Sequence, residues 1–311
     1  MTTITSDDYE DFLRPTERLD RDLIKALKAG GDEIGLETAR CLVAMYYNVQ
    51  EQRKQSGNRI SAALRHGGDP GGLVKWFHKQ NEVFEAQISR AIKAISNQSE
   101  ISQWAAEVVG MGEVLAVGLW AYIDMDIATT VSKIWRFAGL DPTCKWEKGQ
   151  KRPFNPDLKV LCWKISDSFV KVSNRLDSYY GRIYRERKEF EILRDGDGYN
   201  KPAAKENLAW RKKKNKKTSA EWRAILESGR LPALILDLRA RRYASKRFLS
   251  HYWEVAYELH HRKKAPRPYV EVHLGHTDIV SAAEVKEYER VNADAEKQRQ
   301  KMLKKEKGGE E

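Results

Sequence analysis

Cysteine, proline and long apolar runs are all scarce in this chain of 311 residues. The three cysteines, Cys41, Cys144 and Cys162, are too few and too widely spaced for a disulfide framework or for a paired-cysteine metal site. No apolar run approaches the roughly 18 residues that a transmembrane helix needs, and the acidic N-terminus lacks the features of a secretory signal. We therefore expect a cytoplasmic protein that makes no membrane contact.

Positive charge is in excess and is placed unevenly. The chain has 56 lysines and arginines against 45 aspartates and glutamates, a formal net charge of +11. Residues 1–37 hold ten acids and five bases, whereas residues 182–223 hold fourteen bases and seven acids, and residues 238–267 nine bases and two acids. This clustering predicts a basic face in the second half of the chain that binds a polyanion, most often nucleic acid. A charge that serves only solubility is the alternative.

Two helices are predicted over residues 38–65 and 73–97, because the glycine- and proline-rich link between them breaks any helix. The second helix carries the heptad spacing of a coiled-coil seam. The seam positions are Val74, Phe77, Asn81, Phe84, Ile88, Ala91 and Ile95. We expect a coiled-coil hairpin through which the chain forms a homo-oligomer. An antiparallel hairpin within one chain is the more modest interpretation.

A Gly-x-Gly turn formed by Gly110 and Gly112 lies between two further predicted helices. Glycine permits positive φ and close approach of a ligand to the backbone. The amides that begin the next helix point outward, at the positive end of the helix dipole. Such a turn suits a DNA phosphate, and helix-hairpin-helix modules hold a backbone in this way without reading sequence. No strand precedes the turn and no GxGxxG motif follows it, so a dinucleotide site is not expected.

A short predicted helix that ends in the text Ala-Gly-Leu-Asp-Pro follows over residues 130–142. The order of Gly-x-Gly helix, acidic linker, short helix and AGLxP resembles the C-terminal transposase domain of the DEDD-type, bridge-RNA-guided insertion-sequence transposases. The resemblance covers residues 104–170, and the predicted hairpin agrees with the coiled coil of that family. It implies DNA binding in transposition or recombination, in a bacterial or phage-infected cell.

Two features of that family are missing from the sequence. The family's RuvC-like domain holds divalent metal with four acids and begins on a β-strand, and the first 100 residues show no such strand. The family's proposed nucleophile is a serine in a Ser-Gly pair, and the matching pair here reads Lys148-Gly149. We therefore assign no catalytic residue. Mg²⁺ is expected only if the chain is an active recombinase.

Lysines and arginines on helices and on one flexible segment are expected to contact phosphate. One helix is predicted from Asn155-Pro156-Asp157 onward, and a basic stripe is predicted on a 29-residue helix over 233–261. Residues 194–222 are predicted to form a basic flexible arm whose cation run is flanked by tryptophans. The expected nucleic-acid-binding residues are Gly110, Gly112, Lys133, Lys148, Lys159, Lys164, Arg211, Lys212, Lys213, Lys214, Lys216, Lys217, Arg239, Arg242 and Lys246.

Five histidines between positions 251 and 276 raise zinc binding as a hypothesis. Their spacing, H-x8-H-H-x11-H-x2-H, matches no standard zinc pattern. No metal site and no cofactor is therefore predicted.

The predicted fold class is mainly α, with a coiled-coil hairpin, a helix-hairpin-helix core and basic C-terminal helices. The predicted segments are an acidic N-terminus (1–37), the hairpin (38–98), a transposase-like domain (99–193), the basic flexible arm (194–222), a basic helix that completes the domain (223–282) and a charged tail (283–311). We interpret the chain as a DNA-binding protein related to insertion-sequence transposases, without strand-transfer chemistry of its own. The alternatives are an active recombinase completed by a partner chain or by RNA, and an RNA-binding or phage structural protein.

The cation run of the predicted arm can be tested by removing its charge. Replacing Lys212, Lys213, Lys214, Lys216 and Lys217 with alanine should flatten the salt dependence of DNA binding, because fewer counterions are released. Binding titrations at two salt concentrations measure this slope. An unchanged slope would show that the run does not contact phosphate.

Overall fold

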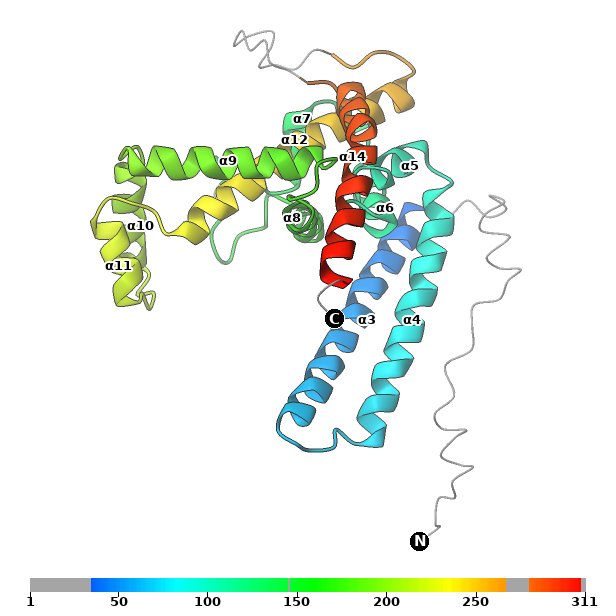
Figure 1. Cartoon of the computed structure of the whole chain (residues 1–311). Helices are drawn as coiled ribbons and strands as arrows, with labels where there is room; N and C mark the ends of the chain where they lie inside the picture. The colour runs from blue at the N-terminus through cyan, green and yellow to red at the C-terminus, as the bar shows by residue number, and fades with distance from the viewer. Residues whose placement is uncertain (1–34, 145, 267–279, 309–311) are drawn as a thin grey trace. The chain divides into compact units, whose positions relative to one another are not determined.

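The computed structural model describes residues 35–144, 146–266 and 280–308 (Figure 1). Over these residues the chain is mainly helical and has no strand, which confirms the predicted fold class at this level. The acidic segment lies outside the described residues up to position 34, as do His273 and His276.

The chain divides into two compact units. The first contains the described residues of 1–106 and 112–124, and the second those of 107–111 and 125–311. The division differs from the predicted boundaries at 98 and 193. One reason is that apolar contacts join the hairpin to the helices that follow it, and another is that a single helix continues through position 193.

The first unit consists of α3 (Leu36–Arg65), α4 (Gly72–Ser96), α5 (Glu100–Ala106) and α6 (Glu113–Tyr122). The bounds of α3 and α4 match the predicted hairpin. Its core members are Ala39, Val43, Val49, Ile88, Ile92, Ile95, Val117 and Ala121, contributed by α3, α4 and α6. The hairpin is therefore stabilised by burial of apolar surface in the half that contacts α6.

The seam of the hairpin only partly follows the heptad prediction. Ile88 and Ile95 are buried, and so is Asn81, whose amide donates to the Phe77 carbonyl of its own helix at 2.9 Å. Phe77 and Phe84 were expected in the seam but are 44% and 41% exposed. Self-association through the hairpin stays a prediction.

Near the connecting turn, polar contacts take the place of the expected apolar seam. Arg53 of α3 forms an ion pair with Glu85 of α4. Ser56 of α3 and His78 of α4 share a hydrogen bond of 2.9 Å. This end of the hairpin therefore depends on specific polar pairing more than on buried apolar area.

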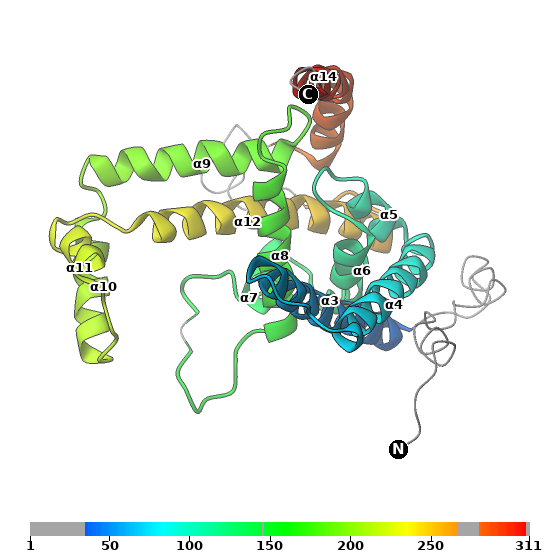
Figure 2. The same cartoon turned by 60° about the horizontal axis from the view of Figure 1, so that its bottom comes forward.

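The second unit is built around α12 (Ala233–His261), a helix of 29 residues whose bounds match the prediction. Packed against it are α7 (Val131–Phe137), α8 (Pro156–Lys171), α9 (Tyr179–Gly196) and α14 (Ala282–Gly308), with α9 running alongside it (Figure 2). A helix of this length spans roughly 43 Å, so α12 can position side chains at both ends of the unit.

The start of α8 confirms the predicted capping signal. The Asn155 side chain accepts hydrogen bonds from the amides of Asp157 and Leu158 at 2.9 and 3.0 Å, and Pro156 occupies the first helical position. The Asn155-Pro156 signal was sufficient to predict where α8 starts, because the Asn155 side-chain oxygen pairs with backbone amides that would otherwise lack a partner.

An aromatic cluster forms the centre of the second unit. Phe169 of α8, Tyr180 of α9 and Phe248 of α12 are buried with ring centroids 4.9 to 5.5 Å apart. The Tyr180 hydroxyl donates to Nδ1 of His251, and Nε2 of His251 donates to the Val280 carbonyl, both at 2.8 Å. Burial lowers the pKa of His251 to about 4, so this histidine is a neutral core residue and not the zinc ligand considered from the sequence.

The predicted flexible arm is helical over most of its length. Its residues form α10 (Lys201–Lys213) and begin α11 (Ala220–Glu227). Ala204, Leu226 and Leu236 are buried together, which holds the pair of helices against the start of α12. The sequence prediction overlooked this because the segment itself contributes few apolar residues, and their partners lie further along the chain.

Helix α14, expected as a solvated tail, has one buried side. Glu289 accepts a hydrogen bond from the Val109 amide, and Glu296 accepts one from the Leu176 amide at 3.0 Å. Burial, partly offset by the Val109 amide and Lys286, raises the pKa of Glu289 to about 7. Glu289 therefore titrates near neutral pH while it connects two segments of the second unit.

Replacing Glu289 with glutamine should change how stability depends on pH. A carboxyl whose pKa is higher in the folded state stabilises the fold at low pH and loses that contribution as pH rises through about 7. Between pH 5 and 8, Glu289→Gln should therefore gain about 2 to 3 kcal/mol relative to the unchanged protein. Urea unfolding of both proteins at pH 5 and pH 8 measures this difference in unfolding free energy. The contribution of His251 cancels because both proteins contain it.

Glu287→Gln is the control, because Glu287 is 58% exposed on the same helix. Parallel pH profiles for Glu289→Gln and the unchanged protein would contradict the assignment of a raised pKa.

Candidate nucleic-acid interface

Gly110, the first glycine of the Gly-x-Gly turn, is packed against the protein. Its φ is +94°, and a Cβ there would lie 2.8 Å from Val172 and 3.3 Å from Phe169. The Ser168 hydroxyl donates to the Gly110 carbonyl. Glycine is required at this position because α8 and its end approach the backbone closely, so no ligand is needed to explain it.

Gly112, the second glycine, begins α6 in the first unit. Its φ of −158° is extended, and no described atom lies within 4 Å of where a Cβ would be. The next residue, Glu113, pairs with Lys93 at 2.8 Å, and this pairing together with the Glu113 amide lowers the pKa of its carboxyl. Because a carboxylate already lies at the start of α6, the geometry disfavours the phosphate site expected at Gly110 and Gly112.

Three of the expected lysines do not line the cavity beside α12 that is described below. Lys133 is exposed on α7 and donates to the Ile127 carbonyl at 3.3 Å. Lys148 is exposed in the connection between α7 and α8, and Lys164 is half-buried on α8. The structure does not bring these three side chains together with the other cations.

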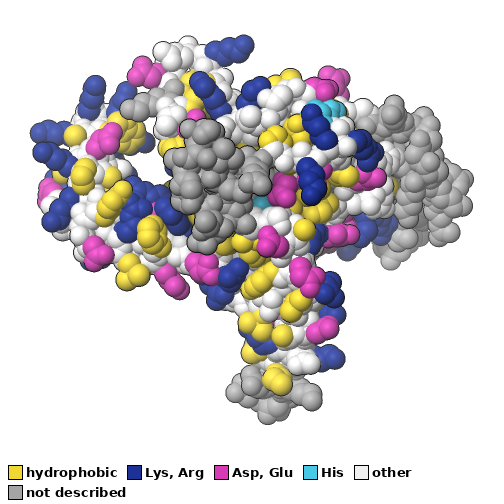
Figure 3. Space-filling model, turned by 90° about the horizontal axis from the view of Figure 1, so that it is seen from above, with side chains coloured by type: hydrophobic (Ala, Val, Ile, Leu, Met, Phe, Trp, Pro, Cys, Tyr) yellow, Lys and Arg dark blue, Asp and Glu magenta, His cyan; other side chains and the backbone are white. Residues whose placement is uncertain are grey.

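The cation run of residues 211–217 surrounds the C-terminal end of α10. Arg211 lies over the Trp222 ring at 4.7 Å, and Lys216 over the Trp210 ring at 4.9 Å. Lys212, Lys213, Lys214 and Lys217 are exposed. Figure 3 shows dark-blue Lys and Arg side chains mixed with apolar ones on its left, where Figure 1 has α9, α10 and α11. The run is therefore an ordered basic surface with stacked tryptophans.

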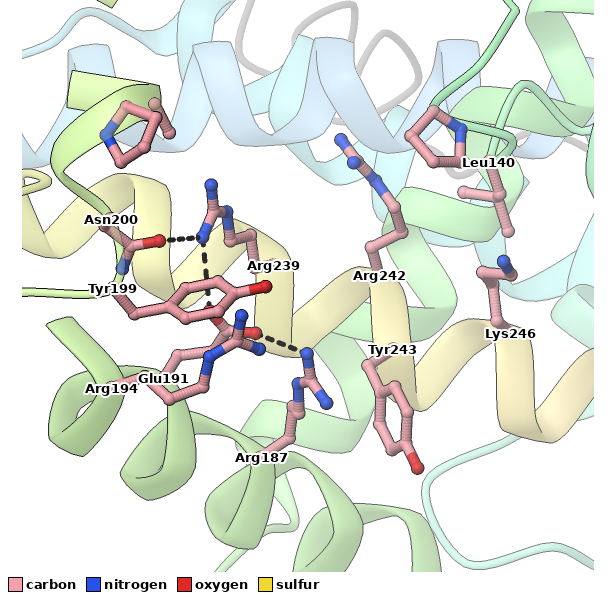
Figure 4. Close-up of a pocket in the computed structure, with 13 residues that line it drawn as sticks. Leu140, Arg187, Glu191, Arg194, Tyr199, Asn200, Arg239, Arg242, Tyr243 and Lys246 are labelled. Atoms are coloured by element: carbon pink, nitrogen blue, oxygen red, sulfur yellow. Dashed lines mark hydrogen bonds and ion pairs between the residues drawn. The ribbon is translucent and has the colours of Figure 1, made fainter. Parts of the chain in front are cut away.

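A cavity of about 650 Å³ lies between α9, α12 and the start of α10 (Figure 4). Five of its lining residues are basic and one is acidic. The lining residues are Leu140, Pro142, Arg187, Glu191, Arg194, Tyr199, Asn200, Pro202, Ala203, Arg239, Arg242, Tyr243 and Lys246. The spacings of three and four residues place the predicted stripe of α12 on one helix face, and that stripe faces this cavity.

A buried polar network holds the walls of the cavity. Glu191 of α9 is 2% exposed and accepts hydrogen bonds from Arg187 and Arg239. Arg239 of α12 also donates to the side chain of Asn200, before α10, at 2.8 Å. The Asn200 amide group donates to Asp195 at 2.9 Å. Three elements are thus connected by hydrogen bonds among these side chains, which makes the cavity a preformed feature.

Three basic residues of the cavity have no ion pair among the described residues: Arg194, Arg242 and Lys246. Loss of hydration and the nearby Arg239 lower the pKa of Arg242. Loss of hydration also lowers the pKa of Lys246; Asp141 partly offsets this effect, and Arg242 adds to it. Arg242 and Lys246 are therefore partly desolvated cations that repel each other, and an anion would relieve the repulsion.

Lys159 of α8 belongs to the same electrostatic cluster. Its ammonium lies 4.2 Å from the centroid of the Phe154 ring. Loss of hydration, followed by Arg242 and Arg152, lowers its pKa. The prediction of Lys159 and the prediction of the α12 stripe therefore refer to one region of positive potential.

Aromatic rings accompany these cations. The guanidinium of Arg194 lies 3.5 Å from the ring centroid of Tyr199, which is 65% exposed. Arg187 lies 4.7 Å from the ring centroid of Tyr243. Cations that alternate with accessible rings are suited to a ligand with both negative charge and flat rings.

Sequence reasoning missed the α9 side of the cavity. Arg187 and Arg194 are seven residues apart, so they lie on one face of α9. The predicted boundary at 193 separated them, which hid this spacing. Tyr199 carried no signal of its own, because its position beside α12 depends on the hydrogen bonds of Asn200.

Within the described residues, no group of three or more histidine, cysteine, aspartate or glutamate side chains could hold a metal ion. Comparison of the chain with protein-family models, curated proteins and solved structures gives no match. None of the described helices has the length and apolar character needed to cross a membrane.

Removing the acid of the cavity network should destabilise the second unit. Glu191→Ala leaves the half-buried side chains of Arg187 and Arg239 without their carboxylate, and the loss of two charge-assisted hydrogen bonds should cost about 2 kcal/mol or more. Urea unfolding followed by circular dichroism measures the loss. Glu186→Ala is the control, because Glu186 is 56% exposed on the same helix and should cost about 1 kcal/mol or less. Equal losses would contradict a structural role for the network.

Proposed function

We propose that this chain binds nucleic acid, DNA in the first place, through its sugar-phosphate backbone. The carrying observation is the cavity beside α12, which is lined by Arg194, Arg242 and Lys246, none of which has a carboxylate partner among the described residues. Other cations of the same helix are paired, as Arg241 is with Asp237. Unneutralised cations in a fixed recess support binding of an anionic ligand.

A polyanion fits this arrangement better than a single small anion. The exposed basic surface of residues 211–217 lies at the far end of α10, roughly 14 Å along the helix from the cavity. One extended chain of phosphates could contact both sites, and each neutralised phosphate would release counterions. The cavity would then hold the strand in place, while the α10 surface would supply additional sequence-independent affinity.

We further propose that the chain is related to the insertion-sequence transposases and lacks strand-transfer chemistry of its own. The support is the resemblance of residues 104–170, together with the absence from the sequence of the family's Ser-Gly pair. The binding role proposed here rests on the cavity and does not require this relationship. An active recombinase completed by a partner chain, and RNA binding, remain the alternatives.

The proposed site is tested by removing two charges from the cavity and comparing the result with two charges removed elsewhere. The double variant Arg242→Ala, Lys246→Ala should weaken binding to duplex DNA and reduce the slope of log K against log salt by about 2. The matched control Lys133→Ala, Lys148→Ala lowers net charge equally, and its slope should change much less.

Fluorescence anisotropy at 50 and 200 mM salt, with duplex DNA and a structured RNA, measures both slopes. Equal effects of the two double variants would show that only net charge matters. Tighter binding of the RNA would favour the alternative of an RNA-binding protein.

A further inference from the structure

We infer that the cavity beside α12 accommodates an unpaired nucleotide, so that its ligand is single-stranded nucleic acid with a base stacked on Tyr199. This inference rests on the proposed function and specifies the form of nucleic acid that the same site takes.

The site is an open recess. Its volume of about 650 Å³ is in the range of pockets that bind a small organic ligand. The surface of a duplex presents phosphates and the edges of bases that are already paired and stacked. A duplex can therefore bring its phosphates to the cations of the recess but cannot place a base inside it, whereas an unpaired nucleotide can enter it.

The aromatic side of the recess is suited to a flat base. Tyr199 stays 65% exposed although Arg194 covers its ring at 3.5 Å. Its only ring contact within the described chain is this stack, which leaves ring surface for a ligand. Unpaired bases stack on tyrosine rings and on guanidinium planes, and the Arg194–Tyr199 pair offers both.

The cationic side lies opposite, as Figure 4 shows, with Arg242 and Lys246 toward Leu140 and away from Tyr199. Leu140, Pro142, Pro202 and Ala203 supply the apolar part of the lining. The recess thus offers a ring, apolar side chains and cations. A nucleotide has a flat base, a sugar and a phosphate, so the recess has a suitable group for each of its parts.

The test compares two strands that carry the same number of phosphates. One is a short oligothymidine, and the other is a strand of equal length made of abasic tetrahydrofuran units. Binding of the full chain to each is measured by fluorescence anisotropy. The unchanged protein should bind oligothymidine about tenfold more tightly than the abasic strand, which is the size of one base-aromatic stack.

Substitutions at Tyr199 separate stacking from charge. Tyr199→Ala should remove the preference for oligothymidine and leave binding of the abasic strand unchanged. Tyr199→Phe keeps the ring and should bind as the unchanged protein does. Phe77→Ala is a matched control, because it removes an exposed ring from α4 in the other unit, and the preference should persist.

Each result has a definite meaning. If the unchanged protein binds both strands equally, the inference is overturned while backbone binding stands. If the Tyr199→Ala variant still prefers oligothymidine to the abasic strand, the base does not stack on Tyr199 and the inference is overturned. If neither strand nor duplex DNA binds, the proposed function itself fails. Oligouridine and its abasic analogue, run in parallel, show whether the preferred strand is DNA or RNA, and a base preference with either supports the inference.

Discussion

The arrangement of the second unit depends on two buried carboxylates of α9. Glu191 and Asp195 are four residues apart, so they lie on one face of that helix. Glu191 binds Arg239 of α12, and Asp195 accepts a hydrogen bond from the Leu231 amide just before α12 begins. Asn200, which binds both Asp195 and Arg239, brings the start of α10 to the same place. The register of three helices is therefore set by hydrogen bonds to two acids.

These acids neutralise only part of the positive charge that they organise. Glu191 is occupied by Arg187 and Arg239, whereas Arg242 is one turn further along α12 and lies beyond its reach. The lowered pKa values of Arg242, Lys246 and Lys159 indicate that this excess charge is unfavourable in the folded chain. A fold that keeps such repulsion in a recess loses some stability there, which is typical of sites that bind a ligand.

Local signals in the sequence were enough to predict several helices but not their partners. The bounds of α12 follow from its apolar periodicity, and Asn155 with Pro156 fixes the start of α8. The helicity of α10 and α11 was not predicted, because it depends on Leu226 packing with Leu236. The candidate site could also be predicted only in part, because its two walls come from helices that are far apart in the sequence. The stripe of α12 was visible in the sequence, whereas its opposite wall on α9 depends on the buried network.

The Gly-x-Gly turn shows why a motif needs its surroundings before it can be given a function. A phosphate site requires free amides and a local positive charge. The structure places Val172 beside Gly110 and a carboxylate, Glu113, directly after Gly112. Close packing and ligand binding both require glycine, so sequence alone could not distinguish them. The cavity differs in this respect. Lys246 packs on the Trp135 ring at 3.9 Å, but neither an ion pair nor a ring contact among the described residues accounts for Arg242. Cations that separate helices bring to one recess, more than the glycine turn, therefore support a binding function.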